Sequence, residues 1–102
     1  MRQEKVVYQL EDMGDPVLRL RATLRQVDEQ GETRYLYRID AFSRLRGNKL
    51  GAAEALAPLG TAEAFAADSR QFQSAPFRQV LEGLSLELVE RYSAAEAAPS
   101  SV

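Results

Sequence analysis

The side chains with the most chemistry to offer are arginines that recur along residues 17–46. Over residues 18–25, the apolar Leu18, Leu20, Ala22 and Leu24 alternate with Arg19, Arg21, Thr23 and Arg25. Residues 34–42 repeat the pattern: one set is Tyr35, Tyr37, Ile39 and Ala41, and the other is Arg34, Leu36, Arg38, Asp40 and Phe42. Guanidinium forks donate paired hydrogen bonds to phosphates and carboxylates. Because successive residues of a strand point to opposite faces, the spacing predicts a β-hairpin with one arginine-rich face. Such a face could hold an anionic or acidic partner.

The composition excludes most catalytic chemistry. The chain has no histidine and no cysteine, so it lacks the commonest general base, the usual zinc ligands and the thiol nucleophile. An enzyme would depend on carboxylates, lysine or tyrosine. Glu82, Glu87 and Glu90 could supply carboxylates, but their spacing fits the solvated side of a helix. We therefore expect a protein that is not an enzyme and uses no metal or other cofactor.

The charge is unevenly spread along the chain. The 102 residues have a net charge of −2. Residues 17–50 carry eight basic and four acidic groups, whereas residues 51–102 carry three basic and seven acidic groups. Such asymmetry bears on association with partners rather than on the fold.

The chain shows none of the usual signals for export or for a membrane. Residues 1–14 have no continuous apolar segment typical of a signal peptide, and no apolar run approaches the length of about 20 residues that spans a bilayer. We expect a cytoplasmic protein with no membrane contact. Arginine far outnumbers lysine and alanine is abundant, a composition that suggests a bacterial or phage source.

The first half of the chain predicts a three-stranded antiparallel meander. Strands are expected at residues 5–11, 17–27 and 33–45, with turns at 12–16 and 28–31. A four-residue loop at 28–31 would pair Leu24 with Tyr35 and Leu20 with Ile39, which brings apolar residues together. The same register would set Arg25 opposite Arg34 and Arg21 opposite Arg38. Those arginines would then have to reach into water, pair with acids of other elements, or bind an anionic partner.

The second half predicts helices. Residues 51–57 could form one helical turn that ends at Pro58 and Gly60, and residues 61–72 a weakly amphipathic helix. The clearest helix covers residues 75–92, and its apolar stripe comprises Phe77, Val80, Leu81, Leu84, Leu88 and Tyr92. Gly83 within that helix suggests close packing on the sheet. Tyr8, Tyr35 and Tyr37 are expected in the core, with their hydroxyls at its rim. Residues 1–93 are expected to form one domain, and residues 94–102 a flexible tail.

These elements predict an α+β fold in which a three-stranded antiparallel meander is followed by two helices, with the C-terminal helix packed on the apolar face of the sheet. The arginine-rich face also carries Val7, Val17, Leu36 and Phe42, and a mixture of arginine with apolar residues is typical of protein interfaces. We therefore expect a small protein-binding module, such as a regulator, an inhibitor or an assembly subunit. Its candidate contact residues are Arg19, Arg21, Arg25, Arg34, Leu36, Arg38, Phe42 and Arg44.

Two other interpretations stay open from the sequence. The same arginines could bind nucleic acid, although the strand tyrosines fall on the opposite face and the protein is acidic. Alternatively, the face could be a solvated surface, or could be covered by the helix expected at 61–72. The partner could also be a second copy of the chain, because a three-stranded sheet leaves open edges.

Overall fold

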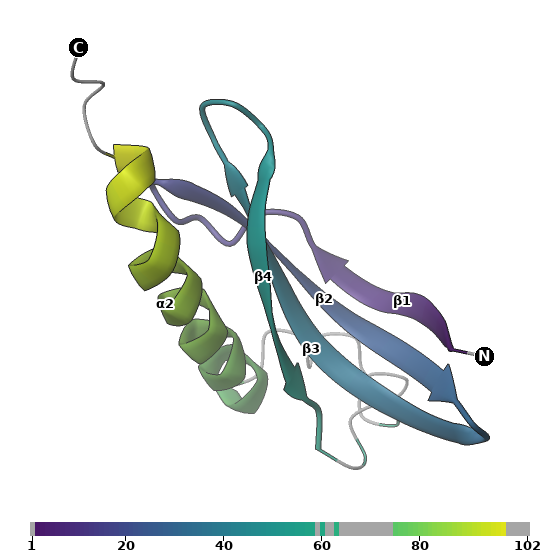
Figure 1. Cartoon of the computed structure of the whole chain (residues 1–102). Coiled ribbons are helices and arrows are strands. Elements are labelled where there is room, and N and C mark those ends of the chain that lie inside the picture. Colours follow the sequence, from purple (N-terminus) through teal and green to yellow (C-terminus); the bar gives the residue numbers. More distant parts are fainter. Residues whose placement is uncertain (1, 59, 61–62, 64–74, 98–102) are drawn as a thin grey trace.

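The fold was obtained as a computed structural model (Figure 1), and the structure describes residues 2–58, 60, 63 and 75–97. Four strands form one antiparallel sheet in the order β1-β2-β3-β4, and a long helix follows them. The elements are β1 (Gln3–Leu10), β2 (Leu18–Glu29), β3 (Glu32–Ser43), β4 (Lys49–Leu56) and α2 (Ala75–Ala97). The predicted α+β class with an antiparallel sheet is confirmed.

The prediction of three strands is wrong, because residues 49–56 form a fourth strand where one helical turn was expected. The alanines of this segment favour a helix on their own, but pairing with β3 gives the backbone its hydrogen bonds and places Ala53 opposite Ile39 in the core. Tertiary pairing therefore overrides local propensity here. The helix expected at 61–72 lies outside the described residues, apart from Glu63, which is helical.

The predicted register of the central hairpin is also wrong, by two residues. Glu29 pairs with Glu32, so the loop has two residues instead of four. Gln30 (φ 52°) and Gly31 (φ 79°) both adopt left-handed backbone angles, as the favoured two-residue hairpin turn requires. A shift of two residues leaves the faces unchanged, so the separation into an apolar and an arginine-rich face is confirmed.

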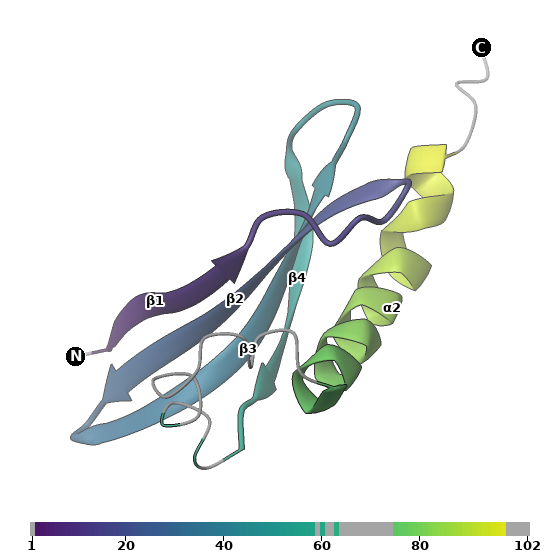
Figure 2. The same ribbon diagram turned by 180° about the vertical axis from the view of Figure 1, so that it is seen from behind.

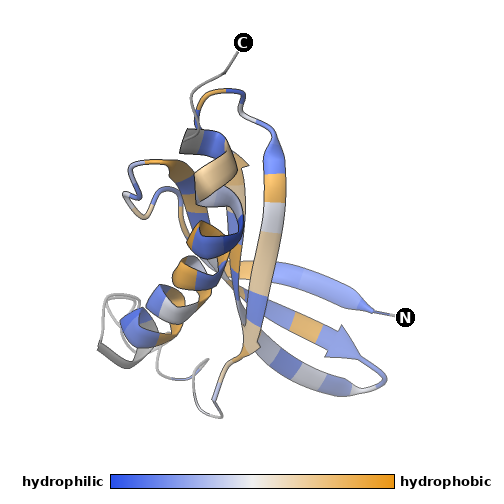
Figure 3. Cartoon of the chain, turned by 60° about the vertical axis from the view of Figure 1, so that its left-hand side comes forward, coloured by the Kyte–Doolittle hydropathy of each residue, from blue (hydrophilic) through white to orange (hydrophobic). Residues whose placement is uncertain are grey.

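The apolar face of the sheet carries α2. The helix packs against β4, β3 and β2 (Figures 1 and 2). Leu81, Leu84 and Leu88 of the predicted stripe are buried, and Val80 and Tyr92 pack against the same core; the side chain of Phe77 lies outside the described ones. Their sheet partners are Leu18, Leu20, Ala22, Leu24, Tyr37, Ile39 and Ala41. The helix continues beyond the predicted end at Tyr92 to Ala97, and hydrophobic positions recur along its length (Figure 3).

The glycine that permits close packing is Gly51 of β4, and the expectation for Gly83 is wrong. A Cβ added at Gly51 would lie 2.8 Å from Cζ and 2.9 Å from Cε2 of Tyr92, whereas one added at the exposed Gly83 would meet nothing within 4 Å. We expect Gly51→Ala to lower the free energy of unfolding by about 1 kcal/mol, because the tip of the Tyr92 ring must move.

The matched variant Gly83→Ala is expected to do the opposite. Alanine in a helix interior is about 0.5–1 kcal/mol more favourable than glycine, and nothing opposes the added methyl group. Urea denaturation of both variants measures the two changes. Stabilisation by Gly51→Ala, or destabilisation by Gly83→Ala, would contradict this packing of α2 on β4.

A β-bulge in β1 changes which of its side chains share a face. Val6 lies opposite Arg25, but Tyr8 lies opposite Leu24, so the register shifts between them. Tyr8 therefore packs against the core, whereas Val6 lies on the arginine-rich face, opposite Arg25. Val17 differs from the prediction: it packs against the core instead of joining the arginines.

Candidate functional site

The sheet face opposite α2, which we call the arginine face, is built from aligned rows of side chains across the strands. Three rows are largely polar: Gln9, Thr23, Arg38 and Glu54; then Arg21, Asp40 and Ala52; then Arg19, Phe42 and Lys49. A fourth row holds Val6, Arg25, Leu36 and Leu56. The hairpin turn at Gln30 and Gly31 sets this alignment, because it fixes which residues of β2 and β3 stand opposite each other.

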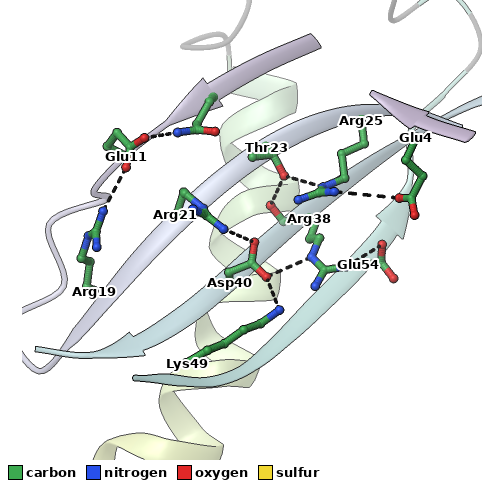
Figure 4. A network of polar contacts seen from close by, with 11 residues as sticks. Glu4, Glu11, Arg19, Arg21, Thr23, Arg25, Arg38, Asp40, Lys49 and Glu54 are labelled. Atoms are coloured by element: carbon green, nitrogen blue, oxygen red, sulfur yellow. Dashed lines mark hydrogen bonds and ion pairs between the residues drawn. The ribbon is translucent and has the colours of Figure 1, made fainter. Parts of the chain in front are cut away.

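Asp40 is the centre of the polar rows (Figure 4). Its side chain is only 1 % exposed, and three cations surround it: Nε of Arg38 at 3.0 Å, Nζ of Lys49 at 3.0 Å and Nη2 of Arg21 at 3.4 Å. Arg38 also reaches Glu54 on β4, at 3.6 Å. The side chains of the cluster thus connect β2, β3 and β4 in addition to the backbone hydrogen bonds of the sheet.

The ionised form of Asp40 is favoured in the folded protein. Burial raises the pKa of this carboxyl group, but hydrogen bonds from Lys49 and Arg38 and the charges of the same two residues outweigh burial, so the pKa lies below 3.8. A carboxylate that several cations hold in its ionised form serves as the centre of a structural ion cluster and does not act as a proton donor or acceptor. We assign Asp40 to holding the arginine face together.

Phe42 lies between two arginines of β2. The guanidinium carbon of Arg21 is 5.1 Å from the centre of the Phe42 ring and that of Arg19 is 5.5 Å away, both within the range of cation–π attraction. Arg19 also pairs with Glu11 at 3.0 Å. Arg21 has a buried Nε with no hydrogen-bond partner among the described residues. Phe42 is therefore half-buried and held in place by its neighbours.

The fourth row is the apolar part of the arginine face, and we call it the apolar row. Val6 is 45 % exposed and Leu56 is 65 % exposed, and Leu36 lies half-buried beside Leu56. Arg25 lies between Val6 and Leu36; its Nε donates to Oγ1 of Thr23 (3.2 Å) and its Nη1 is 4.0 Å from Glu4. The result is an exposed apolar strip, crossed by one positioned arginine.

Two of the predicted contact residues lie outside these rows. Arg34 is on the arginine face in the row next to the apolar row, opposite Val27, and pairs with Glu29 at 3.5 Å. Arg44 follows β3 and reaches the β1–β2 loop, where it forms two hydrogen bonds with the Asp12 carboxylate (2.8 and 3.0 Å). That contact lowers the pKa of Asp12. Arg34 therefore borders the apolar row, whereas Arg44 is engaged at the other end of the sheet, away from it.

The predicted register would have set arginine opposite arginine, but no two arginines of β2 and β3 stand opposite each other. Arg21 stands opposite Asp40, Arg38 opposite Thr23 and Arg25 opposite Leu36. The face also gains acids that sequence reasoning had not placed there, chiefly Glu4 and Glu54. Arg19, Arg21, Arg25 and Arg38 each lie within 4.0 Å of a carboxylate (Figure 4), so the charges of the face are nearly balanced.

The missed residues belong to the outer strands. Glu54 and Leu56 were not assigned to the face because residues 51–57 were expected to be helical, and Lys49 was not assigned because it follows the last expected strand, at residues 33–45. The only sequence signal for them is the alternation of Lys49, Ala52, Glu54 and Leu56 with smaller residues, interrupted at Leu50 by a second register shift. Such a short and alanine-rich pattern does not distinguish a strand from a helix.

The remaining candidate residues lie on α2 and in or beside the core. Within the part of the chain that the structure describes, no group of three or more carboxylates could hold a metal ion. Glu82, Glu87 and Glu90 are exposed on α2, and Tyr37 is buried in the core with Tyr8 and Tyr35 packed beside it.

None of the described helices is long and apolar enough to cross a membrane.

Comparisons with known proteins add no family to this description. Searches against protein-family models, curated proteins and solved structures find no match to this chain.

Proposed function

We propose that this protein is a small non-catalytic binding module that recognises another protein through its arginine face, as a regulator, an inhibitor or an assembly subunit. The apolar row is the observation that carries the proposal. Val6, Leu36 and Leu56 form an apolar strip with Arg25 across the four strands, on the face that α2 leaves open. A row of aliphatic side chains crossed by an arginine has the composition of the centre of a protein interface.

The organisation of the charges supports a protein partner. Asp40 holds Arg21 and Arg38 in fixed positions through ion pairs. These side chains therefore lose little conformational entropy when a partner binds. The charged rows then flank the apolar row and can supply specificity at its rim. A cytoplasmic location is part of this proposal.

Nucleic-acid binding by the same arginines is the alternative function, and the charge balance gives it less support. Nucleic acid is attracted by cations that are free to neutralise phosphates. Here Arg19, Arg21, Arg25 and Arg38 are each paired with a carboxylate. A nucleic-acid partner would have to displace Glu11, Glu4 and Asp40.

The proposal is tested by a matched pair of leucine variants. Immobilised wild-type chain is used to capture proteins from a nuclease-treated lysate of the source cell, in parallel with Leu56→Glu and Leu45→Glu. Leu56 lies in the apolar row, whereas Leu45 is exposed in the turn after β3. We expect a captured protein to bind Leu56→Glu at least about tenfold more weakly, a loss of about 1.4 kcal/mol, and to bind Leu45→Glu like the wild type.

The salt dependence of capture separates the two functions. Binding centred on the apolar row should weaken only slightly between 50 and about 500 mM salt, whereas contacts with several phosphates would lose orders of magnitude in affinity. Equal capture by both leucine variants would refute the proposed contact. Retention of only nucleic acid from an untreated lysate, lost as salt rises, would establish the alternative.

A further inference from the structure

The outer edge of β1 is an unpaired strand edge with exposed apolar side chains. β1 ends the strand order, so no described strand pairs with its outer side, and it lies at the edge of the sheet farthest from α2 (Figures 1 and 2). Val6, Val7 and Leu10 are all among the exposed large hydrophobic residues. Open edges of this kind pair readily with another strand.

The bulge makes β1 symmetric about the bond between Val6 and Val7. On the N-terminal side of this bond, Glu4 and Val6 lie on the arginine face and Lys5 lies on the α2 face. On the C-terminal side, Gln9 lies on the arginine face, whereas Tyr8 and Leu10 lie on the α2 face. An antiparallel copy with Val6 opposite Val7 therefore brings residues of the same face together along the strand. A strand without the bulge would place them on opposite faces in this register.

The charges at the two ends of β1 are complementary in the same arrangement. The N-terminal end carries Lys5 and Arg2, and Arg2 lies 3.6 Å from Glu4 of the same chain. The C-terminal end is followed by Glu11, which pairs with Arg19 of the same chain at 3.0 Å. With Val6 opposite Val7, Arg2 of each copy stands opposite Glu11 of the other, and Glu4 opposite Gln9. Opposite charges across an antiparallel pair stabilise it.

The face that carries α2 offers further apolar surface to a second copy. A shallow groove runs between α2 and the β1–β2 loop, lined by apolar residues that include Met13, Leu20, Leu86 and Val89. A two-fold axis perpendicular to the sheet would put both helices on one side of an enlarged sheet. Exposed Leu10 on β1 and exposed Leu86 on α2, from both copies, would then lie on that same side, where each can lose contact with water.

We propose that two copies of this chain associate through β1, in antiparallel register with Val6 opposite Val7 of the second copy, to form a symmetric dimer with one continuous sheet. Such isologous two-fold dimers are the commonest form of homo-oligomer. This inference goes beyond the proposed function, since it uses the outer edge of β1; it shares Val6 with the apolar row and leaves Leu36, Leu56 and β4 open.

The mass of the protein in solution tests the proposal. Light scattering or sedimentation equilibrium, over about a 100-fold range of concentration up to about 0.5 mM, should show a transition from the 11.4 kDa chain to its dimer. Val6→Lys places cations of both copies beside the axis and should raise the dissociation constant at least about tenfold. Leu56→Lys, on the opposite edge, is the matched control and should dimerise like the wild type. Circular dichroism checks that both variants fold.

A charge-reversal pair tests the register. Arg2→Glu and Glu11→Arg should each weaken the dimer about fivefold, because like charges then face each other, and the double variant should recover most of that loss. A chain that stays monomeric up to about 0.5 mM would overturn the proposal. Dimers that survive Val6→Lys but not Leu56→Lys would place the interface on β4, and would overturn it too. Failure of the double variant to recover would rule out this register.

Discussion

Replacing Asp40 with asparagine is expected to lower the free energy of unfolding by about 2–3 kcal/mol. Removing the charge leaves Arg21, Arg38 and Lys49 close together around a neutral group. Breaking a fully buried ion cluster costs about 3–5 kcal/mol, but these cations keep part of their contact with water, so the expected effect is smaller. The change is measured by urea denaturation at pH 7.

Glu54→Gln is the control for Asp40→Asn. Glu54 pairs with the same Arg38, but its side chain is 40 % exposed, and exposed ion pairs contribute only about 0–1 kcal/mol. Equal effects of the two substitutions would show that burial of Asp40 does not matter, and would contradict the role assigned to the cluster.

The stability of the wild type should also fall in acid, because the pKa of Asp40 is lower in the folded than in the unfolded protein. A depressed pKa contributes stability that is present above the unfolded value of 3.8 and is lost as the pH falls through the folded value. Asp40→Asn should remove this part of the acid dependence, measured by denaturation between pH 5 and about pH 2. The contributions of Asp12 and Asp28, whose pKa values are also lowered, should remain.

Leu88→Ala is expected to cost about 3–4 kcal/mol. Leu88 of α2 is fully buried against the sheet, and deletion of a fully buried leucine side chain loses its transfer free energy and leaves a cavity. Leu86→Ala, two residues away on the exposed side of α2, should change the free energy of unfolding by less than about 1 kcal/mol. Similar losses for both variants would contradict the orientation of α2 on the sheet.

The faces of the central hairpin and the apolar stripe of α2 could be predicted from the sequence. Both depend on strong periodicities: Leu18, Leu20, Ala22 and Leu24 recur every second residue, and Leu81, Leu84 and Leu88 every third or fourth. Burial of one face enforces such patterns, because the wrong periodicity would expose several leucines at once.

The register and the fourth strand could not be predicted in the same way. A register shift of two residues keeps every side chain on its face, so hydrophobic pairing alone could not distinguish the four-residue loop from the two-residue turn at Gln30 and Gly31. For β4, the alanines at 52, 53 and 55 fit a helix or a strand, and only the open edge of β3 selects the strand.

These two errors also determined what was missed in the candidate site. The wrong register set arginine against arginine and hid the pairing of Arg21 with Asp40. The missing strand removed Glu54 and Leu56 from the arginine face. A face that was expected to need an anionic partner is instead nearly balanced in charge, and its exposed apolar row becomes the most informative feature.

Carboxylate footprinting of the complex tests most directly whether the arginine face binds the partner. Exposed carboxylates are labelled with a carbodiimide and an amine, with and without the captured protein, and are quantified by mass spectrometry. We predict protection of Glu54 and Glu4, which border the apolar row, and unchanged labelling of Glu87 and Glu90, which are exposed on α2. Protection of Glu87 and Glu90 with no change at Glu54 and Glu4 would contradict the account.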